Sequence, residues 1–559
     1  MRNLYKNILT LLEENTNSYS EKIALGIKSQ LGWKEFTYRG LGLMSRKIAS
    51  YLINDLKVEK GDKLAILSES KPEYGACVFA SIISGMITVP LDNKLTIYEL
   101  KSILSDCRPT VLMVSIHNVE KGLELMEAVD SIKKIIVMDE PSYKMELNSI
   151  YTLPDNYDCK WVHRSKKSTA LIIYTSGTTG SPKGVEITFG NLLAQLIGCD
   201  DAIVDIIKTP TMNILSILPM NHLFELTVGF SVFLNHGYSV YYTSSLKPND
   251  ILGIMKEKQV GFMIVVPAFL KLLKTSVEAQ VKALPVVPRT IFNFMYKLAG
   301  FIPFYSIKKL MFTSLHKNFG GKLQGFVAGG APLEKEVGTF FERIGLKVYQ
   351  GYGLTETSPV VAVNRDFYFR DLASVGRPLK GFEARIDETT GELMLKGPSV
   401  MKGYYNRPEL TAETITEDGW LHTGDIARIA KNGNIYITGR IKNMIVLSGG
   451  KKVFPEEVEA VLDKSPLFAE VCVFGAKRTF GSKDGTEDII AVVVPKPELI
   501  NEYQDDAELN KVVRAEVKKL SQQLTAYKRP VNITVLKDPL PKTTTRKVKR
   551  NEVKELVKI

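Results

Sequence analysis

The 559-residue sequence has only five cysteines and no long hydrophobic run. The cysteines are scattered and never stand in CxxC spacing, which argues against a disulfide framework or a zinc site. The most apolar runs, such as 262–270, fall far short of the roughly 18 residues that a membrane-spanning helix needs. Glu13 and Glu14 interrupt what would have to be the apolar centre of a signal peptide. These absences predict a protein of the reducing cytoplasm, for which any membrane contact is peripheral.

Length and composition instead indicate a large folded protein with a positive charge. Hydrophobic residues make up 45% of the chain and charged residues 24%, as in ordinary globular proteins. A chain of 559 residues is too long for one hydrophobic core, so several packed units are expected. The net charge of +12 favours acidic partners such as nucleotides, the phosphates of CoA or anionic lipid. No nucleic-acid partner is expected.

Segments of strand and helix character alternate along the first third of the chain. Residues 63–67 and 111–114 have the composition of buried strands, whereas 41–52 and 74–86 have a helical pattern. This alternation predicts parallel α/β layering. Further on, an Asn-Gly pair at 432–433 lies between two apolar segments and predicts a β-hairpin.

A loop rich in hydroxyl groups and glycine follows the apolar run 170–173. It reads TSGTTGSPKG over 175–184. Backbone N–H groups and short side chains in such a loop can surround phosphate oxygens, and Lys183 adds a positive charge. Gly184 follows Lys183 where a Walker A loop would have Ser or Thr, so a kinase or ATPase of that class is disfavoured. A surface turn of the same composition is the alternative.

Five further motifs follow this loop in a fixed order. They read GGAP at 329–332, YGLTET at 352–357, GWLHTGD at 419–425, GRIKN at 439–443 and PKTTTRK at 541–547. With the loop, this series resembles the adenylate-forming superfamily of acyl-CoA synthetases, peptide-synthetase adenylation domains and firefly luciferases. The resemblance covers nearly the whole chain. It implies an α/β fold with a large N-terminal domain, 1–441, of layered α/β subdomains and a small β-barrel-like part, followed by a small mobile α+β domain, 442–559.

The resemblance also implies a binding site for ATP and Mg²⁺. The residues expected to contact the nucleotide are Thr175, Ser176, Gly177, Thr178, Thr179 and Lys183 at the phosphates, Gly330, Ala331, Pro332, Gln350, Gly351, Tyr352 and Gly353 at the adenine, and Asp425 and Arg440 at the ribose. Glu356 is the expected Mg²⁺ ligand, since Mg²⁺ prefers hard oxygen ligands, and Thr355 would meet the α-phosphate. For Arg440, a surface ion pair is the alternative.

Other matched positions concern catalysis and movement. Lys547 matches the lysine that enters the site for adenylation, and Lys442 matches the hinge about which the C-terminal domain rotates. His222 matches a site-lining position, although composition alone favours a core histidine. Two glycines, Gly449 and Gly450, would admit the pantetheine arm of CoA. The family usually has glycine where this chain has Arg546, which leaves the register of Lys547 against Lys542 open.

The expected activity follows from the resemblance. A carboxylate is a poor acyl donor, and these enzymes activate it with ATP as an acyl-adenylate before a thiol replaces AMP. The implied protein is therefore a fatty acyl-CoA ligase that uses ATP, Mg²⁺ and CoA. An acyl–acyl carrier protein ligase or a fatty acyl-AMP ligase is the enzymatic alternative. A nucleotide sensor or a lipid-surface binding protein is the alternative outside enzymes.

The segment 269–324 differs from the rest of the chain in composition. It has nine basic residues, among them Lys308 and Lys309, and one acid, Glu278, interleaved with aromatic and large aliphatic side chains. Such a pattern is typical of interfacial helices that lie on anionic lipid, and within the family it resembles the long-chain branch. Ordinary core helices with a solvated basic face would have the same composition.

Overall fold

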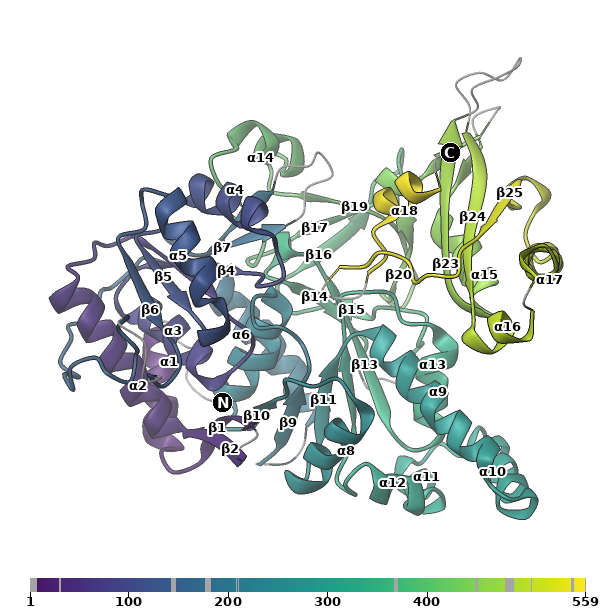
Figure 1. Cartoon of the computed structure of the whole chain (residues 1–559), viewed down its shortest axis with the longest axis horizontal. Coiled ribbons are helices and arrows are strands. Elements are labelled where there is room, and N and C mark those ends of the chain that lie inside the picture. The colour runs from purple at the N-terminus through teal and green to yellow at the C-terminus, as the bar shows by residue number, and fades with distance from the viewer. Residues whose placement is uncertain are drawn as a thin grey trace. The chain divides into compact units, whose positions relative to one another are not determined.

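The computed structural model describes residues 8–29, 32–141, 147–175, 182–207, 209, 211–365, 370–447, 451–477, 487–503, 505–543 and 547–557. The chain divides into two compact units. The first comprises Met1–Glu383 and Lys396–Leu421, and the second comprises Ala384–Leu395 and His422–Ile559. Figure 1 shows the helices and strands of both. No helix in the described part of the chain is long and apolar enough to cross a membrane.

The larger sheet of the first unit is mostly parallel. Its order is β15-β14-β13-β12-β11-β9-β10-β1-β2 across the described residues. The strands are β1 (Ile23–Ser29), β2 (Gly32–Thr37), β9 (Asn213–Ser216), β10 (Ser239–Tyr242), β11 (Phe262–Val265), β12 (Gly325–Ala328), β13 (Lys347–Gly353), β14 (Val360–Val363) and β15 (Arg377–Pro378). The run from β13 to β1 is parallel, whereas β2, β14 and β15 are added antiparallel at the edges.

The second sheet of this unit has the order β18-β8-β7-β4-β3-β5-β6 over the described residues. Its strands are β3 (Lys63–Leu67), β4 (Ile87–Leu91), β5 (Val111–Val114), β6 (Lys134–Val137), β7 (Thr169–Thr175), β8 (Lys183–Thr188) and β18 (Gly403–Tyr404). Strands β3 to β7 are parallel, and β8 and β18 extend the sheet antiparallel. The strands predicted at 63–67 and 111–114 are thereby confirmed.

Helices α2 (Tyr38–Ser50), α3 (Pro72–Ile83) and α6 (Phe189–Ile206) and the π-helix η3 (Glu225–Val232) share one apolar core with strands of both sheets. Local capping explains where two of them begin. The hydroxyl of Thr37 accepts the N–H of Gly40 at 3.0 Å, and Thr188 and Asn191 form a capping box at the start of α6. Phe230 and Tyr38 are among the largest fully buried side chains.

Four helices separate β11 from β12. They are α9 (Pro267–Ala283), α10 (Val286–Ala299), α11 (Tyr305–Met311) and α12 (Thr313–Asn318). Figure 1 shows α10 projecting from the end of α9 at the periphery of the unit. Phe269, Leu270, Phe312 and Phe319 of this segment are buried in the core. The segment therefore combines core packing with a projecting part.

Besides the two-stranded pair of β21 (Ile445–Val446) and β22 (Lys452–Val453), the described residues of the second unit form two further sheets. One has the order β16-β17-β19-β20, formed by β16 (Glu383–Ile386), β17 (Glu392–Lys396), β19 (Leu421–Ile429) and β20 (Ile435–Arg440). The predicted hairpin is confirmed, since β19 and β20 pair antiparallel and Gly433 in the turn has a φ of 84°. The other sheet joins β23 (Phe468–Lys477), β24 (Glu487–Pro495) and β25 (Asn532–Val535), and it packs against α15 (Pro455–Leu462) and α17 (Asp506–Ser521).

The predicted α/β class, with a large first part and a smaller second part, is confirmed. Strands β16, β17, β19 and β20 form a four-stranded sheet, and the expected β-barrel-like part of the first domain stays a prediction. The predicted boundary between 1–441 and 442–559 falls inside the second compact unit, which also includes His422 to Arg440. The predicted boundary marks the expected hinge at Lys442, whereas the compact units are defined by their internal contacts. The boundary therefore stays a prediction.

Candidate active site

Three predicted site segments follow neighbouring strands of the larger sheet. Strand β9 leads to His222, β12 leads to Gly330, and β13 leads through Tyr352 to Glu356. These strands are parallel through β11, so their carboxyl ends lie at one edge of the sheet. Ligands of α/β proteins bind at such an edge. The fold therefore brings these three segments to one edge of the sheet, although they are far apart in the sequence.

Glycines shape the predicted adenine slot. Gly330 has a φ of 82°, in the left-handed region that favours glycine. A Cβ on Gly353 would lie 1.7 Å from the carbonyl oxygen of Pro359, so no larger residue fits there. Gln350 is buried within β13, whereas Gly351, Tyr352 and Gly353 are partly exposed. Next to Gly330, Ala331 is partly exposed and Pro332 is exposed. The geometry permits close approach of a flat ligand, and adenine binding stays a prediction.

His222 is half-buried in the turn that follows β9. Its backbone N–H donates to the carbonyl of Pro219 at 3.0 Å, and its carbonyl accepts the N–H of Leu226 at 3.0 Å. Glu225, in the next turn, is fully buried and accepts a hydrogen bond from the hydroxyl of Ser216 at the end of β9. Burial raises the pKa of Glu225 to about 8, which keeps it neutral at pH 7. This contact ties the helix that begins after His222 to the sheet edge.

The two strands on either side of the predicted phosphate-binding loop, β7 and β8, pair antiparallel with each other. Thr175 is the last residue of β7 and pairs with Lys183, the first residue of β8. Ser176, Gly177, Thr178 and Thr179 lie outside the described residues. The structure therefore fixes the two ends of the loop opposite each other, and phosphate binding by the loop stays a prediction.

Glu356 lies in the 3₁₀ turn η4 (Thr355–Thr357) and contacts a residue that the sequence did not indicate. The hydroxyl of Tyr404 donates to Oε1 of Glu356 at 2.8 Å. The same ring lies 5.7 Å from Nζ of Lys183, measured to the ring centroid. Tyr404 thus contacts both the predicted metal ligand and the predicted phosphate-binding lysine. No local signal marks it, because Glu356 is 48 positions away in the sequence.

The residues around Glu356 are compatible with Mg²⁺. No group of three or more His, Cys, Asp or Glu side chains that could hold a metal occurs among the described residues. Mg²⁺ is usually held by one or two carboxylates together with phosphates of the substrate, so it does not require such a cluster. A single partly exposed carboxylate beside a lysine fits this mode of binding.

In the second unit, Asp425 and Arg440 face each other across the β19–β20 hairpin. Nε of Arg440 donates to Oδ1 of Asp425 at 2.6 Å, and Asp425 is buried. Arg440 thus forms an ion pair, as its alternative interpretation expected, and its partner is the other predicted ribose residue. A carboxylate oriented in this way could accept hydrogen bonds from ribose hydroxyls. Ribose binding by either residue stays a prediction.

Lys547 lies in the same unit, and the charges of these two residues act on its pKa. Desolvation by surrounding atoms and the positive charge of Arg440 lower the pKa of Lys547, and Asp425 opposes the shift, although the side chain retains access to solvent. The positive charge of Lys442 also lowers the pKa of Lys547. In contrast, Nζ of Lys542 is bound to Oε1 of Glu470 at 2.6 Å. These contacts favour Lys547 over Lys542 as the catalytic candidate. Arg546, Gly449 and Gly450 lie outside the described residues.

Comparison with solved structures defines the class of the fold. The ATP-bound RpMatB-BxBclM chimera B1 has a TM-score of 0.80 and 25% identity, with 99% of both chains covered. The o-succinylbenzoate CoA synthetase from Bacillus subtilis, solved with the acyl-adenylate intermediate OSB-AMP, has a TM-score of 0.73 and 25% identity, with 97% of both chains covered. The fold is that of adenylate-forming enzymes.

Comparison of sequences gives the family. Residues 12–405 match the AMP-binding enzyme family, and residues 457–547 match the C-terminal domain of AMP-binding enzymes. The chain belongs to this family. A long-chain-fatty-acid–CoA ligase of Escherichia coli O6:H1 is 28% identical over 588 residues, which cover 99% of this chain and 94% of the relative. The resemblance stated from the motifs is thereby confirmed.

Proposed function

We propose that the protein is a fatty acid–CoA ligase that works in two steps. In the first step, a carboxylate oxygen of the acid attacks the α-phosphorus of ATP, which gives an acyl-adenylate and releases pyrophosphate. In the second step, the thiol of CoA attacks the acyl carbon, loses its proton and displaces AMP. Membership of the family and the names of similar proteins support the reaction class. An apolar cavity whose wall includes Leu226, one helical turn after His222, supports the proposal that the acid is a fatty acid.

The candidate residues would divide the first step among them. Glu356, with phosphates of ATP, would hold Mg²⁺, which neutralises charge on the phosphates. Lys183 would contact the outer phosphates, and Asp425 would orient the ribose. Lys547 would stabilise the negative charge that develops between the carboxylate and the α-phosphate. In the second step the thiol of CoA must reach the acyl carbon. The glycines at 449–450 are the candidates for the position at which the pantetheine arm would pass close to the backbone.

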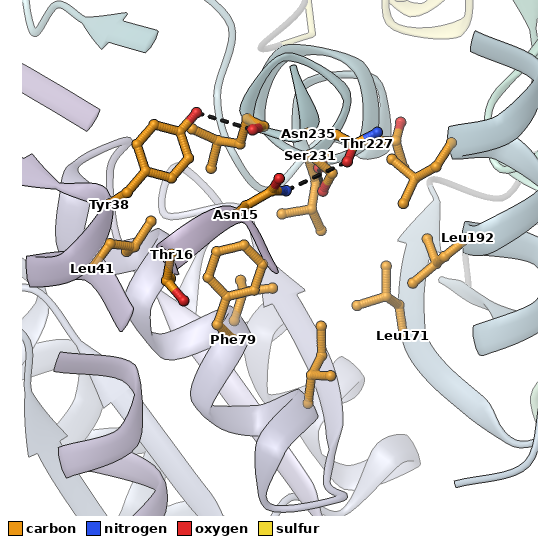
Figure 2. Close-up of a pocket in the computed structure, with 15 residues that line it drawn as sticks. Asn15, Thr16, Tyr38, Leu41, Phe79, Leu171, Leu192, Thr227, Ser231 and Asn235 are labelled. Atoms are coloured by element: carbon orange, nitrogen blue, oxygen red, sulfur yellow. Dashed lines mark hydrogen bonds between the residues drawn. The ribbon is translucent and has the colours of Figure 1, made fainter. Parts of the chain in front are cut away.

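Elements of the first unit line the cavity, and the space in it that a water-sized sphere can enter has a volume of about 50 Å³. A space of this size is smaller than usual small-molecule sites, so the side chains of the wall would have to move apart to admit an acyl chain. Figure 2 shows side chains from separate helices and from β7, among them Phe79, Leu171 and Leu192, around the space. Leu226, one helical turn after His222, also lines it.

Polar residues in the cavity wall bond mainly to nearby carbonyl groups. The hydroxyl of Tyr38 donates to the carbonyls of Leu234 at 3.0 Å and Tyr238 at 2.8 Å. The hydroxyls of Thr227 and Ser231 donate to backbone carbonyls at 2.6 and 2.7 Å. Because these groups already have partners, the wall offers mainly hydrocarbon to a ligand. This supports an aliphatic chain as the occupant.

Filling the cavity should shorten the acids that the enzyme accepts. Leu196→Trp places a larger side chain in the wall, so kcat/KM for long-chain acids should fall at least about tenfold relative to short-chain acids. Leu196→Met, which nearly conserves volume, should change this ratio little. Thermal unfolding of both variants checks that they fold. An equal loss for long and short acids, or an unchanged ratio in a folded Leu196→Trp variant, would place the acyl chain elsewhere.

CoA is the proposed acceptor because similar proteins are named CoA ligases or CoA synthetases. A carrier protein remains the alternative acceptor, and release of the acyl-adenylate without a thiol is the outcome for a fatty acyl-AMP ligase. A nucleotide sensor or lipid-binding protein without activity is less favoured, since Lys547 and Glu356 are both present and have charged or polar partners.

We also propose that α10 and α11 contact an anionic membrane from the cytoplasmic side. The apolar ridge of these helices and their flanks comprises Val286, Val287, Ile291, Phe294, Leu298, Phe301, Phe304, Ile307 and Leu310, all exposed. Phe301 is 86% exposed and Leu310 76%, values that a soluble surface rarely shows for contiguous large side chains. Lys282 and Lys297, exposed in the same segment, supply the charge that would favour anionic lipid.

The structure corrects one part of the sequence interpretation of this segment. Lys308, expected among the lipid-facing cations, is only 8% exposed, and burial lowers its pKa. Lys309 is half-buried and donates to the carbonyl of Leu323 at 3.4 Å. The alternation of lysines and aromatics did not reveal which side of α11 faces the core. Exposed cations nearer the ridge are therefore better positions for a test.

Charge reversal at two of these positions should weaken binding to anionic vesicles. Each basic residue near such a surface contributes on the order of 1 kcal/mol, so Lys282→Glu with Lys297→Glu should reduce vesicle binding at least about tenfold. Wild-type binding should weaken as salt rises. Lys511→Glu with Lys518→Glu on α17 makes the same charge change elsewhere and should bind like wild type. Equal binding by all three proteins, or binding indifferent to lipid charge, would refute the membrane proposal.

A further inference from the structure

The segment 399–405, which contains β18, runs alongside the strand that follows the phosphate loop. Tyr404 pairs with Val185 of β8. The N–H of Tyr405 donates to the carbonyl of Gly184 at 2.7 Å, and the N–H of Lys402 donates to the carbonyl of Glu186 at 3.0 Å. The segment is therefore fixed against β8 directly after Lys183.

The same segment also holds the turn that carries Glu356. The N–H of Met401 donates to the carbonyl of Glu356 at 2.8 Å. The hydroxyl of Ser358 donates to the carbonyl of Ser399 at 2.8 Å. Segment 399–405 thus joins the two candidate ligand-binding elements, which come from different sheets, by backbone hydrogen bonds on both sides.

Tyr404 is the residue of this segment whose side chain contacts both elements. Its hydroxyl donates to Oε1 of Glu356 at 2.8 Å, and its ring lies 5.7 Å from Nζ of Lys183. A carboxylate has two oxygens, and a donor on one of them fixes the direction in which the other points.

We propose that Tyr404 is a positioning residue for the metal and the phosphates. Its hydroxyl would hold Glu356 so that the second carboxylate oxygen faces Mg²⁺, while its ring would hold the ammonium of Lys183 on the side of the phosphates. This inference rests on the proposed function, because it assumes that Glu356 binds Mg²⁺ together with ATP. It adds a residue to the site that connects metal binding with phosphate binding.

The test measures binding of ATP by calorimetry across a series of Mg²⁺ concentrations, without any acid substrate. Tyr404→Phe keeps the ring and removes the hydroxyl, so the Mg²⁺ concentration for half-maximal effect on ATP binding should rise about tenfold or more. ATP binding without Mg²⁺ should stay at the wild-type level. Tyr404→Leu removes the ring as well and should also weaken ATP binding without Mg²⁺. Tyr405→Phe, whose ring lies by Lys63 rather than Lys183, is the matched control and should behave as wild type.

Two results would overturn the inference. One is an unchanged Mg²⁺ dependence in Tyr404→Phe. The other is an equal loss of ATP binding with and without Mg²⁺ in that variant, since this would indicate a structural role alone. Failure of the proposed function looks different, because wild type and variants would then bind ATP with the expected Mg²⁺ dependence but release no pyrophosphate with any acid.

Discussion

Replacement of Lys547 by alanine is expected to abolish acid-dependent release of pyrophosphate and to leave thioester formation from supplied acyl-adenylate largely intact. Lys547 lies beside Asp425 and Arg440, where its charge could meet the transition state of the first step. Loss of one group that stabilises developing charge typically lowers kcat by about 10²–10³. The second step displaces AMP and does not need this charge. Assays of the two half-reactions separately, with purified acyl-adenylate for the second, measure the difference.

Lys542→Ala is the matched control for this prediction. Lys542 belongs to the same motif but is bound to Glu470, so its loss should leave both half-reactions within a few-fold of wild type. If Lys542→Ala rather than Lys547→Ala lost the first step selectively, the assignment of the lysine would be wrong by five positions. If Lys547→Ala reduced both steps equally, its proposed role in adenylation would be wrong.

Lys442→Pro should separate the two half-reactions in another way. Lys442 lies in the short 3₁₀ turn η5 (Ile441–Asn443), which in the chain follows Arg440 and precedes the segments that lead to Lys547. Proline fixes φ near −65°, so a hinge at this position could no longer change its backbone angles. One half-reaction should survive, and the other should fall on the order of 100-fold because reacting groups are held out of place.

The control for the hinge is Lys442→Ala, which removes the charge and leaves φ free. Both half-reactions should persist in this variant. Retention of both steps in Lys442→Pro would show that no rotation occurs about this residue. Loss of both steps in the alanine and proline variants alike would assign Lys442 to binding rather than to movement.

Features of the fold that depend on local sequence could be predicted. The buried strands at 63–67 and 111–114 are runs of apolar and β-branched residues, and the hairpin at 432–433 follows from its Asn-Gly turn. The predicted site segments at the ends of β9, β12 and β13 lie at one sheet edge because parallel strands align their carboxyl ends. For the strands and the hairpin, the local pattern of residues was sufficient, whereas the strand order that aligns the site segments came from the structure.

Features that depend on distant contacts could not be predicted. The bond between Tyr404 and Glu356 joins residues 48 positions apart, and the choice between Lys542 and Lys547 depends on Glu470, 72 positions before Lys542. The cavity wall draws on helices and a strand from 15 to 235, which no local pattern brings together. Burial of Lys308 depends on how α11 packs, and composition alone cannot determine this. In each case the cause is tertiary packing.

The most direct test of the proposed function is a single assay with a panel of carboxylic acids. Pyrophosphate release is measured first for each acid with ATP and Mg²⁺, and AMP release is then measured with and without CoA. We expect pyrophosphate release to depend on the acid and to be greatest with aliphatic chains, and AMP release to require CoA and to accompany formation of the acyl-CoA thioester. Absence of pyrophosphate release with every acid, or AMP release that CoA does not increase, would contradict the assignment as a fatty acid–CoA ligase.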